Sequence, residues 1–249
     1  MEHVLFYIVI LLANIIQGIT GFAGTILAMP FSLRLVGMDT AVPVLNALGL
    51  LSGIYVFAGN YRHVKWKELL RVVIVMGIAL LAGIWIRSSL SGRPRLLYCI
   101  LGVLVLAISV RGLFTVLSPK AAETGGKQPS AGSEALQWAL LVAAGIVHGM
   151  FVSGGPLLIA YLTKRIENKE EFRATISTVW IFLNGILLIS QIAAGQWTAA
   201  LLKTQLISIP FLLAGMFIGS VLYKRMSQRV FMIITYVLLL IAAVTLFFK

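Results

Sequence analysis

The chain has few charged residues for its length and a single cysteine, and both shortages limit what it can be. Charged side chains make up 11% of the 249 residues and hydrophobic residues 60%, whereas soluble domains carry about 25% charged residues. All eight acidic residues lie between or beside apolar runs, as the cost of a carboxylate in hydrocarbon requires. The composition therefore excludes an ordinary water-soluble fold and predicts an all-α, polytopic integral membrane protein.

The sequence also lacks the common signatures of enzymes and metalloproteins. Cys99 stands alone, so the chain forms no internal disulfide and no cysteine zinc cluster. It has no Gly-x-x-x-x-Gly-Lys-Ser/Thr phosphate loop, no His-Glu-x-x-His metal motif and no paired intramembrane aspartates. We therefore expect no enzymatic activity, no bound cofactor and no metal site.

Positive charge is in excess, with a formal net charge of +12. Lysine and arginine cluster at the ends of apolar runs, where they meet anionic headgroups and orient the chain. We therefore expect the lipid bilayer, and no nucleic acid, to be the partner of these charges. No basic stretch precedes the first apolar run and no small-residue cleavage site follows it, so we expect this run to remain in the mature protein.

Eight apolar stretches predict a multi-pass protein of the cell membrane. Most are close to the roughly 20 residues that cross a bilayer as a helix. They span 4–36, 40–59, 69–90, 96–117, 136–163, 174–194, 204–223 and 230–248. A Pro/Gly/Ser-rich stretch separates the fourth from the fifth and reads as a flexible linker. The predicted units are a first transmembrane repeat (1–117), the linker (118–133) and a second transmembrane repeat (134–249).

The two halves resemble each other when one is shifted by about 131 positions. Gly18 then falls on Gly149 and Gly24 on Gly155, and later matches drift only to a shift of 136. A duplication explains this economically, and the alternative is chance similarity between apolar sequences. Internal repeats of this kind are common in secondary transporters, whose substrate sites lie at the repeat interface.

The first stretch of each half is predicted to be broken or re-entrant. Residues 4–36 would form a helix about 50 Å long, against a hydrocarbon core of about 30 Å, and the glycines of 18–24 lie in the middle. The fifth stretch carries glycines and a proline in 145–156, which weaken a continuous helix. Irregular backbone is tolerated in a membrane only where protein or a polar cavity surrounds it. The two interruptions are therefore the candidate site.

The basic residues help to choose a topology. If all eight stretches simply cross, 9 of the 20 lysines and arginines lie on one side and 11 on the other, which favours no orientation. If the first and fifth stretches are hairpins, the halves become inverted and the division is 6 against 14. The six are Arg34, Arg87, Arg93, Arg95, Lys203 and Lys249. This division favours inverted repeats, with the richer side in the cytoplasm.

Backbone amides at helix breaks suit anions, because the starts of helices carry partial positive charge and free N–H groups. We therefore expect the glycines and hydroxyls of both breaks to bind a small anionic substrate. The alternative is that the glycines only allow close helix packing. The candidates are Gly18, Thr20, Gly21 and Gly24 in the first half and Gly149, Ser153, Gly154 and Gly155 in the second.

His148 is the only ionisable residue deep within an apolar run. It is a candidate anion partner or proton carrier, and the alternative is a neutral histidine bonded to a neighbouring carbonyl. Its repeat counterpart is Gln17, another polar side chain and a further candidate ligand of the substrate. Asn46 and Asn184 lie near the middle of the second segment of each repeat and are candidate cavity liners, or simply interhelical bonds. The charged stretch 164–173 is predicted to be a solvated connection.

The glycine patterns resemble a known family. Gln17-Gly-Ile-Thr-Gly-Phe-Ala-Gly24 followed by Pro30, and His148-Gly-Met-Phe-Val-Ser-Gly-Gly-Pro-Leu157, are similar to sequences of the sulfite exporter TauE/SafE family of membrane transporters. The resemblance covers almost the whole chain outside the linker. It implies secondary transport, without a cofactor, of small and often sulfur-containing anions such as sulfite, thiosulfate or organosulfonates. The first copy has fewer glycines than the family often shows.

These observations give three hypotheses for function. The first is a secondary carrier of a small anion, coupled to a proton or a cation or uncoupled. The second is a non-transporting membrane component that scaffolds or assists a partner protein. The third is a passive channel, which would show neither saturation nor counterflow.

Overall fold

The computed structural model describes residues 2–89, 103, 106–107, 109–114, 116–117, 134–152 and 154–247. Within these ranges the regular elements are helices and none is a strand. Five of the helices described are long and apolar enough to cross a membrane. The predicted all-α, polytopic membrane class is therefore confirmed. The linker 118–133 and most of the fourth apolar stretch lie outside the described residues.

The helices follow the predicted apolar stretches, with two stretches each divided into two helices. The bounds are α1 Glu2–Thr20, α2 Ala23–Val36, α3 Met38–Asn60, the short 3-10 helix η1 Tyr61–His63, α4 Trp66–Ser89, α7 Glu134–Phe151, α8 Gly155–Leu162, α9 Lys169–Ala193, α10 Ala199–Lys224 and α11 Gln228–Phe247. The helices α9 and α10 begin five residues before their apolar runs, because membrane helices continue into the headgroup region.

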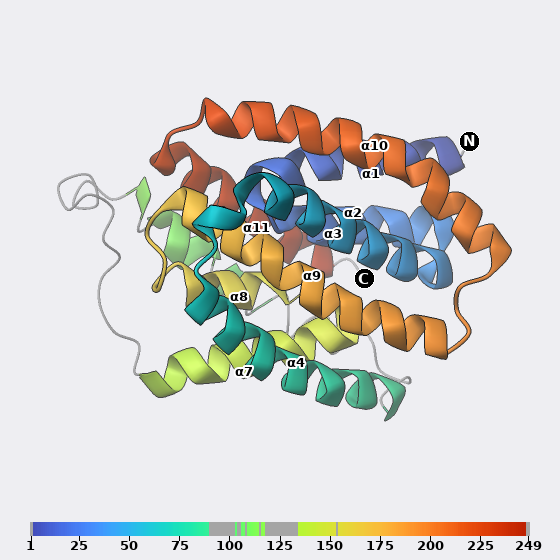
Figure 1. Cartoon of the computed structure of the whole chain (residues 1–249), viewed down its shortest axis with the longest axis horizontal. Coiled ribbons are helices and arrows are strands. Elements are labelled where there is room, and N and C mark those ends of the chain that lie inside the picture. Colours follow the sequence, from blue (N-terminus) through green and yellow to red (C-terminus); the bar gives the residue numbers. More distant parts are fainter. Residues whose placement is uncertain are drawn as a thin grey trace.

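The first apolar stretch is a hairpin. In Figure 1, α1 runs inward from the N-terminus and α2 returns towards the same end of the molecule, where α3 begins. A hydrogen bond of 2.9 Å from the Gly24 amide to Gln17 Oε1 joins the two helices. The helices α7 and α8 fold back in the same way from the opposite end. The interruptions predicted in the first and fifth stretches are therefore present.

The helix contacts are reciprocal between the two halves. The helix α1 packs along α10, α7 packs along α4, and α3 packs on α9. Glycines allow the close approach: Gly18 faces Met216 and Gly219 of α10, while Gly149 faces the carbonyl of Leu80 on α4. Two related halves, each packing its hairpin on a helix of the other, would produce this pattern. The duplication itself remains a prediction.

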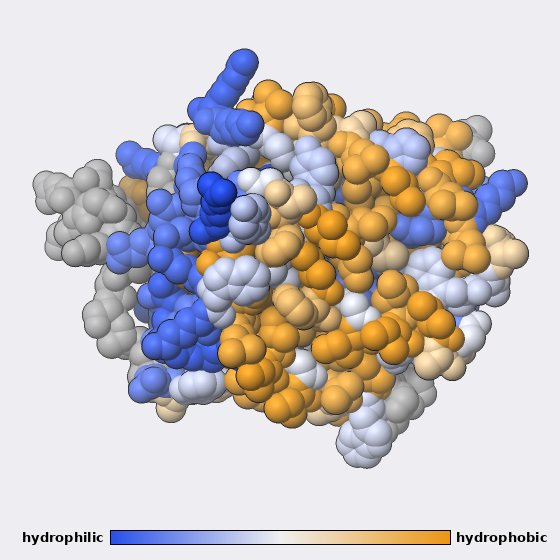
Figure 2. All heavy atoms as spheres, viewed as in Figure 1, coloured by the Kyte–Doolittle hydropathy of each residue, from blue (hydrophilic) through white to orange (hydrophobic). Residues whose placement is uncertain are grey.

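One end of the molecule collects most of the described lysines and arginines, and we call it the basic end. It is formed by residues 61–67, 134–137, 163–169 and 224–229, which Figure 2 shows as hydrophilic beside an apolar belt. Its connections are tied together by the ion pair of Lys65 with Glu171 at 2.8 Å and by the hydrogen bond from Lys169 Nζ to the Met226 carbonyl at 2.5 Å. The uneven charge agrees with the hairpin topology.

One prediction about this end is wrong. The whole stretch 164–173 was expected to be a solvated connection, but α9 begins at Lys169. Asn168 starts it, because its side-chain oxygen accepts the amides of Glu170 and Glu171. Arg173 is consequently one turn inside the helix and only 4% exposed.

Candidate functional site

The first break is a left-handed turn at a glycine. The helix α1 ends at Thr20, Gly21 has a φ of +83°, and α2 begins at Ala23. The Gly21 amide still donates to the Gln17 carbonyl at 2.7 Å, so the chain reverses directly after the last helical turn. Glycine adopts this conformation without the steric cost that a side chain brings.

The second break repeats this geometry at a residue that is not glycine. Val152 has a φ of +55°, and its amide donates to the His148 carbonyl at 2.8 Å. Val152 lies 131 positions after Gly21, the shift that aligns the two halves. A positive φ is unfavourable for a β-branched residue, and such strain gathers at functional sites. The strained backbone of the buried Val152 therefore indicates that the residues packed around the second break hold it in this conformation.

The carbonyl at the first break is heavily bonded. The Gly21 oxygen accepts hydrogen bonds from Trp180 Nε1 at 3.0 Å, Gln17 Nε2 at 3.3 Å and Ser177 Oγ at 3.4 Å. Two of these donors belong to α9. An unbonded carbonyl is costly in the interior of a membrane protein, so α9 holds the turn of the α1–α2 hairpin in place.

The first amides of α2 are capped from α1. The Phe22 and Ala23 amides donate to Thr20 Oγ1 at 3.4 and 3.2 Å, and the Gly24 amide donates to Gln17 Oε1. Thr20 and Gln17, two predicted anion ligands, therefore accept hydrogen bonds from the backbone of the break in this conformation. At the start of α8 the N-cap residue is Gly154, which has no side chain with which to cap the helix.

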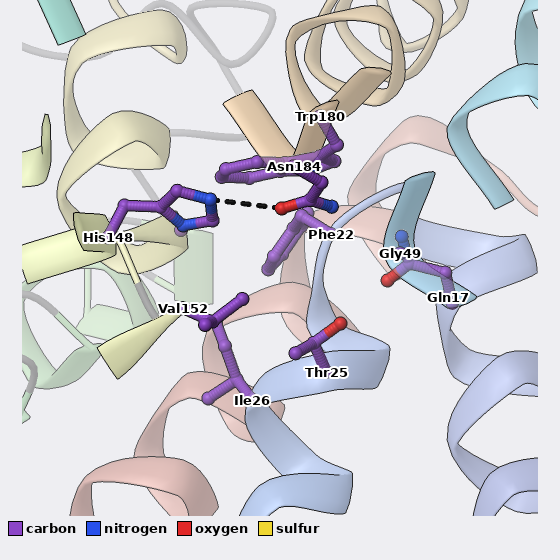
Figure 3. A pocket seen from close by; sticks show the side chains of 10 residues that line it. Gln17, Phe22, Thr25, Ile26, Gly49, His148, Val152, Trp180 and Asn184 are labelled. Atoms are coloured by element: carbon purple, nitrogen blue, oxygen red, sulfur yellow. Dashed lines mark hydrogen bonds between the residues drawn. The ribbon is translucent and has the colours of Figure 1, made fainter. Parts of the chain in front are cut away.

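A small cavity lies where the two breaks meet, with room for about one water-sized molecule. Figure 3 shows its walls, which come from both hairpins together with α3 and α9. The start of α8 reaches it at Gly155. The lining residues are Gln17, Phe22, Thr25, Ile26, Gly49, His148, Val152, Gly155, Trp180 and Asn184.

His148 is the ionisable group among these lining residues. Its side chain is 2% exposed, and Nε2 lies 3.0 Å from Asn184 Oδ1 (Figure 3). Nδ1 has no hydrogen-bond partner among the described residues. The Trp180 ring lies beside the imidazole, with the centroids 5.1 Å apart. The cavity is therefore lined by a buried imidazole with one nitrogen hydrogen-bonded and the other without a partner in the described ranges.

A second small cavity adjoins the first. It shares Gln17, Thr25 and Gly49 with it and continues past Asn14 and Ser52. Gln17 Nε2 donates to Ser52 Oγ at 3.1 Å, so this side chain stands between the two spaces. Polar atoms thus extend from the meeting point of the breaks along the interface of α1 with α3.

Asn46 lies one layer behind the cavity. Its Nδ2 donates to the Asn184 carbonyl at 3.2 Å and to Gln191 Oε1 at 3.1 Å, which joins α3 to α9. Its Oδ1 is buried without a partner among the described residues. Asn46 therefore supports the backbone of Asn184, and it is not a lining residue of the cavity.

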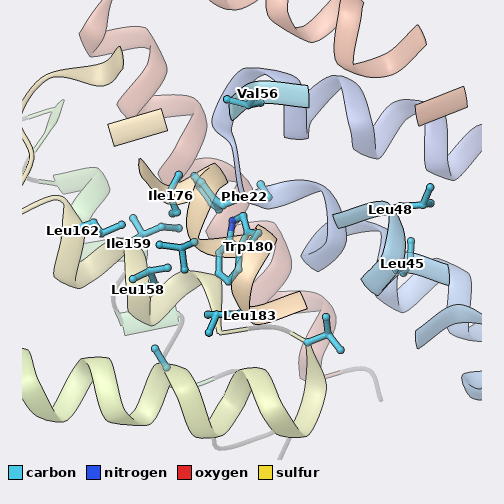
Figure 4. Close-up of a cluster of buried hydrophobic side chains, with 14 of the residues drawn as sticks. Phe22, Leu45, Leu48, Val56, Leu158, Ile159, Leu162, Ile176, Trp180 and Leu183 are labelled. Carbon is cyan, nitrogen blue, oxygen red and sulfur yellow. The ribbon is translucent and has the colours of Figure 1, made fainter. Parts of the chain in front are cut away.

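An apolar shell surrounds the polar centre on the side of α8. Leu158 and Ile159 pack near Phe22, Ile176 and Trp180 (Figure 4). All five are buried. This shell keeps lipid and water from the imidazole and amide groups, and it lowers the local dielectric constant, which strengthens hydrogen bonds inside the cavity.

The structure brings some predicted site residues together and separates others. Gln17, His148, Gly155 and Asn184 line the cavity, and Gly24 lines its neighbour. Gly18 and Gly149 face other helices, as the packing alternative supposed. Thr20 and Gly21 form the first break, and Gly154 packs on Ala144 and His148. Ser153 lies outside the described residues.

Sequence reasoning missed Trp180 as a site residue. It lies four positions before Asn184 and three after Ser177, so these three residues share one face of α9. That spacing was the available signal. Among the described residues, no group of three or more His, Cys, Asp or Glu side chains could hold a metal ion.

Comparison with known proteins agrees with this architecture. The family described as "Sulfite exporter TauE/SafE" matches residues 6–246. A curated protein of Comamonas testosteroni named "Probable inner membrane transporter protein TsaS" is 26% identical over 167 residues, which cover 67% of this chain and 65% of that relative. No solved structure matches the chain. Because the family match covers nearly its whole length, and because five of the described helices are long and apolar enough to cross a membrane, the chain is a multi-pass membrane protein that belongs to the sulfite exporter TauE/SafE family.

Proposed function

We propose that the chain is a secondary transporter of a small anion across the cell membrane, and that the cavity between the two breaks binds this anion. The observation that carries the proposal is the position of His148. His148 lines a cavity that the start of α8 also reaches, and its Nδ1 has no hydrogen-bond partner among the described residues. A buried imidazole and the positive end of a helix together make an environment for negative charge.

The lining residues favour an anion over a cation. None of the ten is aspartate or glutamate. The polar groups present are amides, a hydroxyl and an imidazole, supplied by Gln17, Asn184, Thr25 and His148. An intramembrane cation site would need carboxylates or several converging carbonyl oxygens. Donor groups in a water-poor cavity instead replace the hydration shell of an oxyanion.

The family match supports a proposal for the class of cargo. Its description names sulfite, and the relative from Comamonas testosteroni is named as an inner membrane transporter. We therefore propose a sulfur oxyanion or an organosulfonate as substrate. Sulfite and thiosulfate are larger than the water-sized space of the described conformation, so their binding would require the cavity to widen. Their oxygens accept hydrogen bonds from amide and imidazole N–H groups.

Transport requires that the cavity open alternately to the two sides. In the described conformation it is small and bordered by the apolar shell of α8. The two hairpins enter from opposite ends of the molecule (Figure 1), so movement of one against α9 would open a path to one side. His148 is the group proposed to carry a coupled proton, because its Nδ1 has no hydrogen-bond partner in the described part of the chain.

Flux into liposomes that contain the purified protein tests this function. Labelled sulfite and thiosulfate are compared with sulfate and acetate, with and without a pH gradient. Saturable uptake of a sulfur oxyanion, accelerated by the same unlabelled anion inside, supports a carrier. Uptake without saturation or counterflow would indicate a channel. No flux of any anion under either condition would contradict transport by the protein alone and favour a partner-dependent membrane component.

A further inference from the structure

The most deeply buried cation described in this chain is Arg173, on the second turn of α9. Its side chain is 4% exposed. Both Nε and Nη2 donate to the Gly18 carbonyl, at 2.9 and 2.5 Å, and Nη2 also donates to Ser220 Oγ at 3.0 Å. The Tyr223 ring lies under the guanidinium, 4.5 Å from its central carbon. Arg173 thus connects the end of α1 with α10.

The charge of Arg173 has no carboxylate partner among the described residues. The ion pairs found there join Glu68, Glu170 and Glu171 to other basic side chains. Arginine is almost never fully buried unless it is paired, because removing a charge from water is costly. A carbonyl, a hydroxyl and an aromatic face offset part of that cost. A net positive charge is therefore left inside the helix bundle.

The position of Arg173 relates it to the cavity. Arg173, Ser177, Trp180 and Asn184 are spaced by four, three and four residues, so they lie on one face of α9. Arg173 donates to the Gly18 carbonyl, and Asn184 lines the cavity. Between them, Ser177 and Trp180 donate to the Gly21 carbonyl. The residues on this face of α9 therefore extend from the His148–Asn184 pair towards the basic end, and Arg173 is the one nearest to that end.

We propose that Arg173 is the charge partner of the transported anion on the basic-end side of the cavity. When the site opens towards the basic end, an oxyanion replaces the Gly18 carbonyl and the Ser220 hydroxyl as the acceptor of the guanidinium hydrogen bonds. The planar guanidinium fork fits two oxygens of one oxyanion, which a carbonyl can match with only one atom. The proposal rests on the anion-transport function and assigns to it a residue outside the cavity.

A purely structural role for Arg173 predicts something different. In that case the guanidinium only secures the end of α1 through Gly18. Replacing it would lower the stability and the maximal rate, with no specific effect on the concentration of anion that half-saturates transport. A charge partner instead changes the KM for the anion, because it contributes to binding.

The test is the KM of liposome uptake for Arg173→Gln, Arg173→Lys and a control, Arg225→Gln. The control removes one exposed positive charge from the same end of the molecule. We expect Arg173→Gln to raise KM about tenfold or more, the worth of a charge-assisted hydrogen bond. Arg173→Lys keeps the charge but loses the fork and should raise KM less. Arg225→Gln should change KM by about twofold or less.

The outcomes separate the two proposals. Unchanged KM in a folded Arg173→Gln protein, with wild-type flux intact, would overturn the role of Arg173 and leave the transport function standing. If the glutamine variant does not fold, Arg173→Lys decides: a raised KM supports the role and an unchanged KM overturns it. An absence of saturable anion flux in the wild type would overturn the transport function itself and the role of Arg173 with it.

Discussion

His148 Nε2 and Asn184 Oδ1 lie 3.0 Å apart, and this contact joins α7 to α9 at the meeting point of the two helix breaks. An amide oxygen only accepts, so in this arrangement Nε2 carries the proton. Nδ1 is then an acceptor without a partner among the residues that the structure describes, and it becomes a donor only when the ring binds a second proton. A bound anion would favour that second proton, which links binding of the anion to binding of a proton.

Replacing His148 with glutamine tests this link. Glutamine keeps a hydrogen-bond donor for Asn184 but does not titrate. We expect a pH gradient that accelerates wild-type uptake to have no effect on the His148→Gln protein, while a gradient of the anion still drives uptake. The measurement is the initial rate in liposomes with and without the pH gradient. Equal acceleration of both proteins would show that His148 does not carry the coupled proton.

Gly155 offers a way to fill the cavity without changing its charge. A Cβ there would lie 2.9 Å from Ile26 Cδ1, the flexible end of a side chain, so Gly155→Ala should fold and keep part of its activity. Gly155→Leu should insert normally and lose uptake by about tenfold or more, because its side chain occupies the space of the substrate. Gly59→Leu is the control, since no atom lies within 4 Å of a Cβ at Gly59. Normal uptake by a correctly inserted Gly155→Leu protein would remove this cavity from the transport route.

A comparison of Gly21 with Gly195, which follows the end of α9, separates the cost of backbone strain from the cost of crowding. Both glycines have positive φ, +83° and +68°. A Cβ at Gly21 would lie 2.6 Å from Ser177 Oγ, whereas nothing lies within 4 Å at Gly195. Gly195→Ala should therefore cost about 1–2 kcal/mol of stability, the cost of the left-handed conformation alone. Gly21→Ala should cost more, which thermal unfolding of both proteins in the same detergent would reveal. Equal losses would mean that Ser177 moves away freely and that the turn is not tightly held.

The hairpin topology predicts which loops share a side of the membrane. In a Cys99→Ser background, Gly37→Cys and Gly195→Cys should react with an impermeant thiol reagent from the same side. Arg62→Cys and Lys164→Cys should react from the other side, which we expect to be the cytoplasm because the basic end carries the excess of Lys and Arg. Labelling of Gly37→Cys from the same side as Arg62→Cys would contradict the hairpin formed by α1 and α2.

The membrane class and the places of the two breaks were predictable from the sequence. Length sufficed for the first stretch, because residues 4–36 exceed what one crossing needs, and the glycines located the interruption to within a turn. The second break was indicated by its glycines, but its strained residue is Val152, which no propensity rule would select.

Partners far apart in the sequence could not be predicted in the same way. Nothing in the neighbourhood of Gly21 indicates that Trp180 donates to its carbonyl, because that contact depends on how α9 packs against the hairpin. Arg173 was misplaced for a related reason. It ends a run of charged residues and was grouped with them, although Asn168 starts the helix five positions earlier and carries Arg173 into the bundle.

The measurement that tests the central claim most directly is equilibrium binding of sulfite or thiosulfate to the purified protein, compared with Asn184→Leu and Gln205→Leu. Both variants remove a buried amide, but Gln205 is not a lining residue of the cavity. If the meeting point of the two breaks binds the anion, Asn184→Leu weakens binding about tenfold or more and Gln205→Leu leaves it nearly unchanged. Wild-type affinity in a folded Asn184→Leu protein would contradict the account.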